Sequence, residues 1–185
     1  FSVFCFLVFI NAFNMFDGIN LQSSLYSIFI LSCIIFFFSN DLLINILLIS
    51  LIAFSYLNYR NKTFLGDSGS LLLSFIIGYI FIKLYNLNLI EYSDKVVIFM
   101  LLPGIDLIRL FILRIFKKRN PLSPDKLHLH HILLKRFSQN QTLLIILFFI
   151  SIPIILDYFN TNNILTILIT IILYFSLLTT IKVSK

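Results

Sequence analysis

Charged residues are scarce in this sequence, and their scarcity excludes an ordinary soluble protein. Only 12% of the 185 residues are charged, whereas 59% are hydrophobic. Soluble domains carry roughly 25% charged and 45–50% apolar residues. The mean hydropathy is +1.02. This composition predicts a membrane protein.

Cysteine is also scarce. The two cysteines, Cys5 and Cys33, both lie inside apolar runs, where a free thiol is commonly a small buried hydrophobe. Two such residues indicate neither a disulfide framework nor a thiolate zinc site.

An initiator methionine and the charged first segment of a signal peptide are both lacking. The chain opens at FSVFCFLVFI and so begins inside a hydrophobic segment. We therefore expect the C-terminal part of a longer protein, with residues 1–185 forming one integral-membrane domain.

Long apolar runs recur along the chain. A straight helix needs about 20 residues to cross a hydrocarbon core of about 30 Å. The runs lack the alternation of barrel strands, and a backbone in lipid must satisfy its own hydrogen bonds, so helices are predicted. The predicted fold is an all-α, polytopic transmembrane bundle with about seven spans, the first truncated. The predicted spans lie near residues 1–13, 22–38, 42–57, 70–85, 96–113, 143–159 and 164–181.

The basic residues predict the orientation of these spans. If the first span ends in the cytoplasm, only Lys83 and Lys95 of the fourteen lysines and arginines fall on the outer side. This is the asymmetry of the positive-inside rule. The predicted cytoplasmic segments are about 11–21, 58–69 and 114–142.

Unusual polar residues gather on the same predicted face. They are Asp17, Asp67, Asp106 and Asp125, several asparagines, and the three histidines His128, His130 and His131. A single such residue is often a paired structural group, but a gathering on one face is more typical of a site.

The stretch NAFNMFDGIN places Asn11, Asn14, Asp17 and Asn20 at three-residue steps. Amide and carboxylate oxygens suit a hard cation or a phosphate-bearing ligand. An amide-rich helix cap explains the stretch equally well when it is taken alone.

The stretch FLGDSGSLLLSF is a small-residue turn that opens the next predicted span. Asp67 or Ser68 could simply cap that helix. Alternatively, the helix N-terminus attracts phosphate while Asp67 holds a magnesium ion that phosphates complete. The lysine of a P-loop is lacking.

The later stretch LLPGIDLIRLF contains Pro103, which can kink its span, and Asp106 three residues before Arg109. A local ion pair is favoured over ligand contact for these two residues.

The histidines that follow have two readings, zinc and phosphate. Their spacing matches no common zinc-binding pattern, so zinc binding is the less favoured of the two interpretations. Beside Lys126, the imidazoles would offer N–H donors to a diphosphate.

Four stretches therefore follow one another between hydrophobic spans: NAFNMFDGIN, FLGDSGSLLLSF, LLPGIDLIRLF and NPLSPDKLHLHH. Together they resemble the second half of the polyprenyl-phosphate N-acetylhexosamine-1-phosphate transferases, that is, glycosyltransferase family 4. They look most similar to the bacterial undecaprenyl-phosphate N-acetylglucosamine-1-phosphate transferase branch. The pattern H-L-H-H resembles that branch more than the phospho-MurNAc-pentapeptide transferases.

The resemblance implies a reaction at the cytoplasmic face of the bacterial inner membrane. A lipid phosphate attacks the β-phosphate of a UDP-amino sugar, which releases UMP and leaves a lipid-diphosphate sugar for cell-envelope polysaccharide synthesis. Mg²⁺ is the implied cofactor, with Mn²⁺ as an alternative. The implied catalytic and metal-binding residues are Asp17 and Asp67. The implied substrate-binding residues are Asn11, Asn14, Lys126, His128, His130 and His131.

The implied partners are a UDP-amino sugar, undecaprenyl phosphate and the lipid bilayer. A homodimer is left open, and no nucleic-acid partner is expected.

Two departures from the family accompany the resemblance. The acidic DDxxD-type motif of an earlier loop has no counterpart, so the chain alone is expected to be inactive. Where many relatives carry a second Asp followed by Gly-Leu, this chain has Asn20, Leu21 and Gln22, which leaves the role of position 20 open.

Three alternatives remain. One is a phospho-MurNAc-pentapeptide transferase-like enzyme, and another is an inactive remnant of the family. The third is a transporter, which would place its acids near the midplane on broken helices, reachable from both faces. The acids of this chain are instead predicted at the cytoplasmic face.

Overall fold

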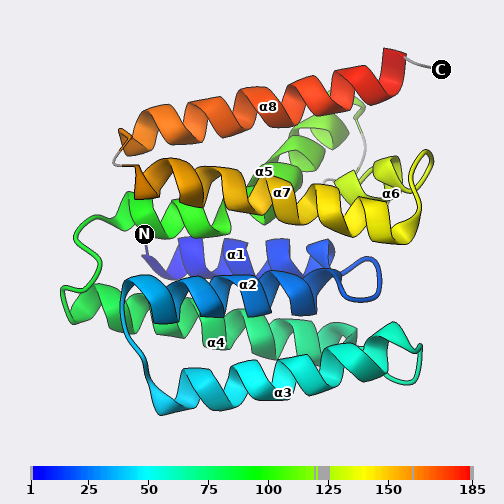
Figure 1. Cartoon of the computed structure of the whole chain (residues 1–185). Coiled ribbons are helices and arrows are strands. Elements are labelled where there is room, and N and C mark those ends of the chain that lie inside the picture. Colours follow the sequence, from blue (N-terminus) through cyan, green and yellow to red (C-terminus); the bar gives the residue numbers. More distant parts are fainter. Residues whose placement is uncertain (1, 119, 121–125, 160, 184–185) are drawn as a thin grey trace. The chain divides into compact units, whose positions relative to one another are not determined.

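The computed structural model describes residues 2–118, 120, 126–159 and 161–183. Within these ranges the regular elements are all α-helices (Figure 1). They are α1 (Ser2–Phe16), α2 (Gln22–Phe37), α3 (Leu42–Tyr59), α4 (Gly66–Asn86), α5 (Ser93–Phe116), α6 (Leu129–Leu133), α7 (Gln139–Tyr158) and α8 (Asn163–Val183). The predicted all-α fold class is confirmed.

Each predicted span corresponds to one of the longer helices. Helices α3, α4, α5, α7 and α8 are long and apolar enough to cross a membrane, and α1 and α2 are shorter apolar helices. The predicted polytopic bundle is therefore confirmed. Helix α6 was not predicted, and it lies within the segment that was expected to be a cytoplasmic loop.

Polar first turns explain where the helix bounds differ from the predicted spans. Helix α7 begins before its apolar run because Ser138 and Gln141 form a capping box. Helix α4 likewise begins at Gly66 rather than at Ser70. Helix α3, by contrast, begins at Leu42 as predicted, and Asp41 caps it by accepting a hydrogen bond from the backbone N–H of Leu43 at 3.0 Å. Hydropathy alone overlooks these polar turns.

The chain forms two compact units, Phe1–Val96 and Val97–Lys185. We call them the N-terminal and C-terminal units. That residues 1–185 make one domain stays a prediction.

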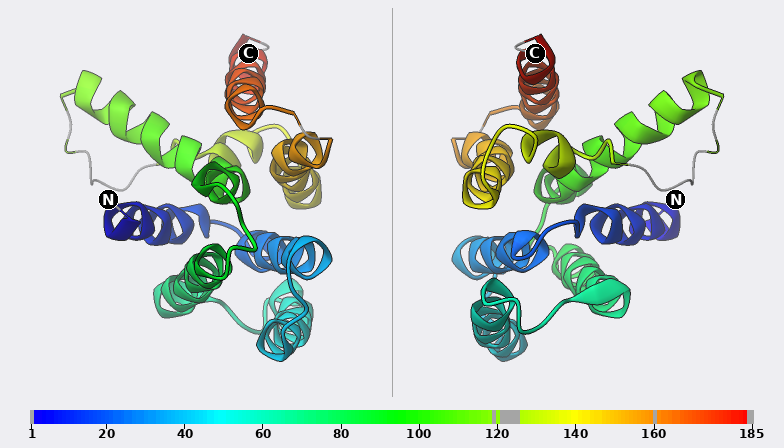
Figure 2. Two further views of the ribbon diagram at one scale, coloured as in Figure 1. Left: turned by 90° about the vertical axis from the view of Figure 1, so that its left-hand side faces the viewer. Right: turned by 90° about the vertical axis from the view of Figure 1, so that its right-hand side faces the viewer.

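The N-terminal unit consists of α1 to α4. Figure 2 views these helices nearly along their axes and shows them lying side by side. Helix α1 packs mainly on α4, and α2 packs mainly on α3. The loop after α1 and the loop before α4 both contribute to one hollow, so this packing joins two motifs that are far apart in the sequence.

In the C-terminal unit, α7 packs on α8 and the short α6 contacts both. Helix α5 contains Pro103, and Figures 1 and 2 show that this helix is bent. A proline inside a helix accounts for such a bend.

Gly78 allows α1 and α4 to approach closely. A Cβ atom at this position would overlap the ring of Phe6 in α1. The Phe6 ring also packs edge-on against Phe75, with 5.5 Å between ring centroids. The contact between α1 and α4 therefore depends on a residue without a side chain.

We expect Gly78→Ala to lower the free energy of unfolding by about 1–3 kcal/mol, because overpacking forces the Phe6 ring or the helices to move. Thermal unfolding in detergent, followed by circular dichroism, measures the effect. Gly104→Ala is the matched control, since a Cβ there meets no atom within 4 Å and alanine has the better helix propensity. Equal melting temperatures for the two variants would contradict the close α1–α4 contact.

Candidate functional site

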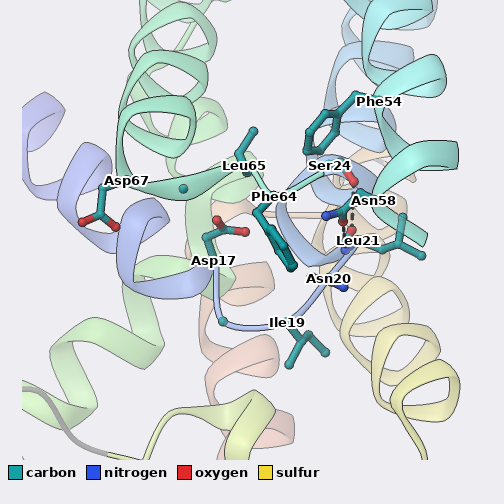
Figure 3. Close-up of a pocket in the computed structure, with 12 residues that line it drawn as sticks. Asp17, Ile19, Asn20, Leu21, Ser24, Phe54, Asn58, Phe64, Leu65 and Asp67 are labelled. Atoms are coloured by element: carbon teal, nitrogen blue, oxygen red, sulfur yellow. Dashed lines mark hydrogen bonds between the residues drawn. The ribbon is translucent and has the colours of Figure 1, made fainter. Parts of the chain in front are cut away.

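A hollow in the N-terminal unit brings together two of the predicted motifs. Figure 3 shows the side chains that line it. They come from the loop after α1, from the start of α2, from the last part of α3 and from the segment that leads into α4. The lining residues are Asp17, Gly18, Ile19, Asn20, Leu21, Ser24, Phe54, Asn58, Phe64, Leu65, Gly66 and Asp67.

Asp17 and Asp67 face this hollow from different elements. Asp17 directly follows α1, and its backbone N–H donates to the carbonyl of Phe13 at 3.1 Å. Asp67 lies in the first turn of α4. Figure 3 shows both carboxyl groups at the same end of the hollow. The structure thus brings together the two acids that the sequence predicts as catalytic.

The electrostatics of this pair favour a bound cation. Burial raises the pKa of Asp17, and the nearby negative charge of Asp67 also raises it. Two neighbouring carboxylates repel each other, and a cation bound near both reduces that repulsion. Mg²⁺ in proteins is held by one or two carboxylates together with substrate phosphates and water. The pair therefore fits the predicted ion, although its ligand role stays a prediction.

The part of the chain that the structure describes contains no group of three or more His, Cys, Asp or Glu side chains placed to hold a metal. A zinc site closed by protein ligands alone needs four such side chains. Asp125, which the sequence places beside the histidines, lies outside the described residues.

Gly66 and Ser70 position Asp67. Gly66 has a φ of +65°, a conformation that glycine adopts at little cost. The Ser70 hydroxyl donates to the side-chain oxygen of Asn14 at 2.6 Å and also lies 3.1 Å from the backbone oxygen of Asp67. Ser70 therefore ties the end of α1 to the start of α4. The oxygen of Asn14, predicted to bind substrate, already accepts this internal bond.

Asn58 is a second link between the two loops, and the sequence reasoning missed it. Its side chain is 4% exposed. Its oxygen accepts from the backbone N–H of Leu21 at 2.7 Å, and its amide donates to the backbone oxygen of Thr63 at 2.7 Å. A lone asparagine near the end of an apolar run carries no signal of such a role.

Asn20 also bridges the loops. Its amide donates to the side-chain oxygen of Asn61 at 2.5 Å. The neutral amide thus joins the first loop to the segment before α4, while any ligand role of position 20 stays open. An aspartate here could not donate this bond.

Asn11, like Asn14, is a predicted site residue that does not line the hollow. It is exposed, its amide donates to the backbone oxygen of Leu7 at 2.8 Å, and it is not among the lining residues. Its predicted contact with substrate stays a prediction.

The predicted histidine segment lies in the C-terminal unit. Lys126 is exposed, whereas His128 is 6% and His130 is 2% exposed. The rings of His128 and His130 are stacked, with centroids 5.6 Å apart. Burial, with a smaller contribution from the neighbouring His131, lowers the pKa of His130 to about 3. His130 is therefore neutral near pH 7 and donates one N–H at most.

A buried polar network holds His128 in place. The guanidinium of Arg109 lies 2.7 Å from Asp106 Oδ1, so the predicted local ion pair is confirmed. The same Oδ1 accepts from the Tyr174 hydroxyl at 2.6 Å, and Oδ2 lies 2.8 Å from His128 Nδ1. Arg109 also donates to the backbone oxygen of Leu127 at 2.6 Å. This network joins α5, the histidine segment and α8.

No sequence pattern indicates the role of Tyr174. The residue lies in the middle of α8, in an apolar run outside all four motifs, and it is completely buried. Only the packing of α8 brings its hydroxyl to Asp106 and to Arg109 Nε, which lies 2.7 Å away.

Comparison with known proteins agrees with the motifs. Residues 1–85 match the model of the family described as glycosyl transferase family 4. The matched family is the one that the motifs indicate, and the match covers residues 1–85.

Two similar curated proteins share one name. The undecaprenyl-phosphate alpha-N-acetylglucosaminyl 1-phosphate transferase of Thermotoga maritima is 31% identical over 152 residues, which are 80% of this chain and 47% of that protein. The enzyme of the same name from Escherichia coli K12 is 29% identical over 150 residues, 74% of this chain and 41% of that protein. The chain thus spans less than half the length of these relatives. No solved structure matches it significantly.

Proposed function

We propose that this protein transfers N-acetylglucosamine 1-phosphate from UDP-N-acetylglucosamine to undecaprenyl phosphate, at the cytoplasmic face of the bacterial inner membrane. The observation that carries the proposal is that Asp17 and Asp67 line one hollow. Both acids lie within the family-matched residues 1–85. The names of the relatives support N-acetylglucosamine as the transferred sugar and undecaprenyl phosphate as the lipid acceptor.

The proposed reaction is a phosphoryl transfer. An oxygen of undecaprenyl phosphate forms a bond to the β-phosphorus of the UDP-sugar. The bond between that phosphorus and the bridging oxygen breaks, and UMP leaves with the electron pair. The products are UMP and undecaprenyl diphosphate N-acetylglucosamine, a lipid-linked sugar for cell-envelope polysaccharide.

The protein's part in such a transfer is mainly positioning and electrostatic stabilisation. Asp17 and Asp67 would hold Mg²⁺, or Mn²⁺ in its place, and that ion supplies positive charge to the diphosphate. Ser70 and Asn58 keep the two loops in place, and so keep the two carboxylates at one end of the hollow. Exposed Lys126 would attract anionic substrates, and the histidine segment would contact the nucleotide sugar.

An enzyme that uses UDP-MurNAc-pentapeptide is the second candidate from the sequence. The names of the two relatives given above specify N-acetylglucosaminyl 1-phosphate transfer. The pentapeptide substrate is therefore not favoured. A transporter is not favoured either, because the curated relatives are transferases.

The test is an exchange assay with membranes that contain the full-length gene product. Radiolabelled UDP-N-acetylglucosamine, undecaprenyl phosphate and Mg²⁺ are supplied, and label is followed into the lipid fraction. We expect lipid labelling that EDTA abolishes and added Mg²⁺ restores, because two carboxylates without a cation repel the diphosphate. UDP-MurNAc-pentapeptide is tested in parallel. Labelling from that donor alone would replace the proposed sugar, and folded protein that labels lipid from neither donor would refute the proposal.

A further inference from the structure

We propose that Asp106 is a positioning residue that fixes the side chain of His128 in one tautomer, with the proton on Nδ1 and the lone pair on Nε2. In this state Nε2 accepts a hydrogen bond from a hydroxyl or N–H group of the nucleotide sugar rather than donating one to a phosphate oxygen. The inference deepens the proposed function and rests on it for the identity of the substrate.

The first observation is the number of donors that Asp106 receives. The side chain of Asp106 is buried, with 3% of its surface exposed. Its Oδ1 accepts from Arg109 at 2.7 Å, from Tyr174 at 2.6 Å and from the backbone N–H of Leu129 at 3.2 Å. Oδ2 lies 2.8 Å from Nδ1 of His128. A carboxylate beside a guanidinium is an acceptor only, so Nδ1 must donate.

The second observation is the charge of the cluster. Arg109 is always protonated in proteins, and it already neutralises Asp106 at 2.7 Å. A neutral His128 thus leaves this buried cluster without net charge, which is the less costly state in a protein interior. A neutral imidazole with its proton on Nδ1 has an acceptor at Nε2.

Tyr174 and Arg109 hold the carboxylate in the orientation that this requires. The Tyr174 hydroxyl donates to Asp106 and accepts from Arg109 Nε at 2.7 Å. Both residues are well buried, with 0% of Tyr174 and 7% of Arg109 exposed. Groups from α5 and α8 therefore hold the carboxylate in place independently of His128. The protonation of the His128 ring then follows from the position of the carboxylate.

The variant Asp106→Asn separates this role from simple packing. An asparagine has one acceptor and one donor end. Three donors face the position of Oδ1 and one group faces Oδ2, so we expect the amide NH₂ to occupy the Oδ2 position. There it donates to Nδ1 of His128, which moves the ring proton to Nε2.

The experiment combines ¹⁵N nuclear magnetic resonance with steady-state kinetics on the full gene product in detergent. Ring-labelled histidine reports which nitrogen carries the proton, and a His128→Gln variant assigns the signal. We expect the Nδ1–H tautomer in the unmodified protein and the Nε2–H tautomer in Asp106→Asn. We also expect kcat/KM for UDP-N-acetylglucosamine to fall about 100-fold, since a donor then faces a donor. The KM for undecaprenyl phosphate should not change.

Tyr174→Phe is the second variant, because it keeps the carboxylate and the charge of Asp106. Here the Nδ1–H tautomer should persist. An Nε2–H tautomer or a doubly protonated His128 in the unmodified protein would overturn the proposal, even if Asp106→Asn fails to fold. An equal loss of kcat/KM for both substrates would indicate a structural role instead. Absence of any transfer by the unmodified protein refutes the proposed function, while the tautomer is still read directly.

Discussion

Replacing Asp67 by asparagine is expected to reduce transfer of N-acetylglucosamine 1-phosphate by at least about 100-fold, the size of effect that follows the loss of one preorganised electrostatic group in an active site. The substitution keeps the size of the side chain and removes its negative charge. Asp67 is exposed in the first turn of α4, so the fold should be retained. The exchange assay with radiolabelled sugar measures the loss.

Glu91→Gln is the matched control for Asp67→Asn. Glu91 is also an exposed acid, but it lies in the loop between α4 and α5 and does not line the hollow. We expect this control to keep full activity and the same dependence on magnesium concentration. An Asp67→Asn protein that labels lipid as fast as the control would remove Asp67 from the catalytic site.

Replacing Arg109 by methionine is expected to lower the free energy of unfolding by about 3–5 kcal/mol, because removing one partner of a buried ion pair leaves the other charge without compensation. The side chains of Arg109 and Asp106 are only 6% and 4% exposed. Methionine fills much of the same volume, so the loss is mainly electrostatic. Thermal unfolding in detergent measures it.

A second ion pair of nearly equal length is the control for Arg109→Met. Lys83 and Asp41 lie 2.8 Å apart, but their side chains are 47% and 33% exposed. Solvent screens exposed pairs, which contribute little to stability. We therefore expect Lys83→Met to leave the melting temperature nearly unchanged. A similar loss for both variants would show that burial does not determine the contribution of Arg109.

The spans could be read from the sequence because burial in lipid needs long apolar runs, and these runs are visible without any tertiary contact. Hydropathy overlooked the polar residues at the ends of helices. The capping box of Ser138 and Gln141 and the first turn of α4 at Gly66 are hydrophilic, yet they belong to helices. Helix α6 is too short to carry a periodic signal, so it was missed as well.

The candidate site was predicted in part. Asp17 and Asp67 stand out because an acid beside glycine at the edge of an apolar run is unusual, and the order of the motifs strengthens the prediction for each residue. Asn58 and Tyr174 do not lie in any of the recognisable motifs. Their roles arise from hydrogen bonds to residues that lie far away in the sequence, and no local pattern encodes those partners.

The sequence by itself determined the membrane class, the positions of the spans, the family resemblance and the acids that belong to its motifs, because composition, hydropathy and motif order are local properties. Only the tertiary structure decided which polar atoms meet. The α1–α4 packing brings Asp17 and Asp67 to one hollow. The packing of α8 brings Tyr174 to Asp106, which leaves His128 with one ring nitrogen already engaged. These contacts depend on the geometry of packed helices, which a linear pattern of residues does not record.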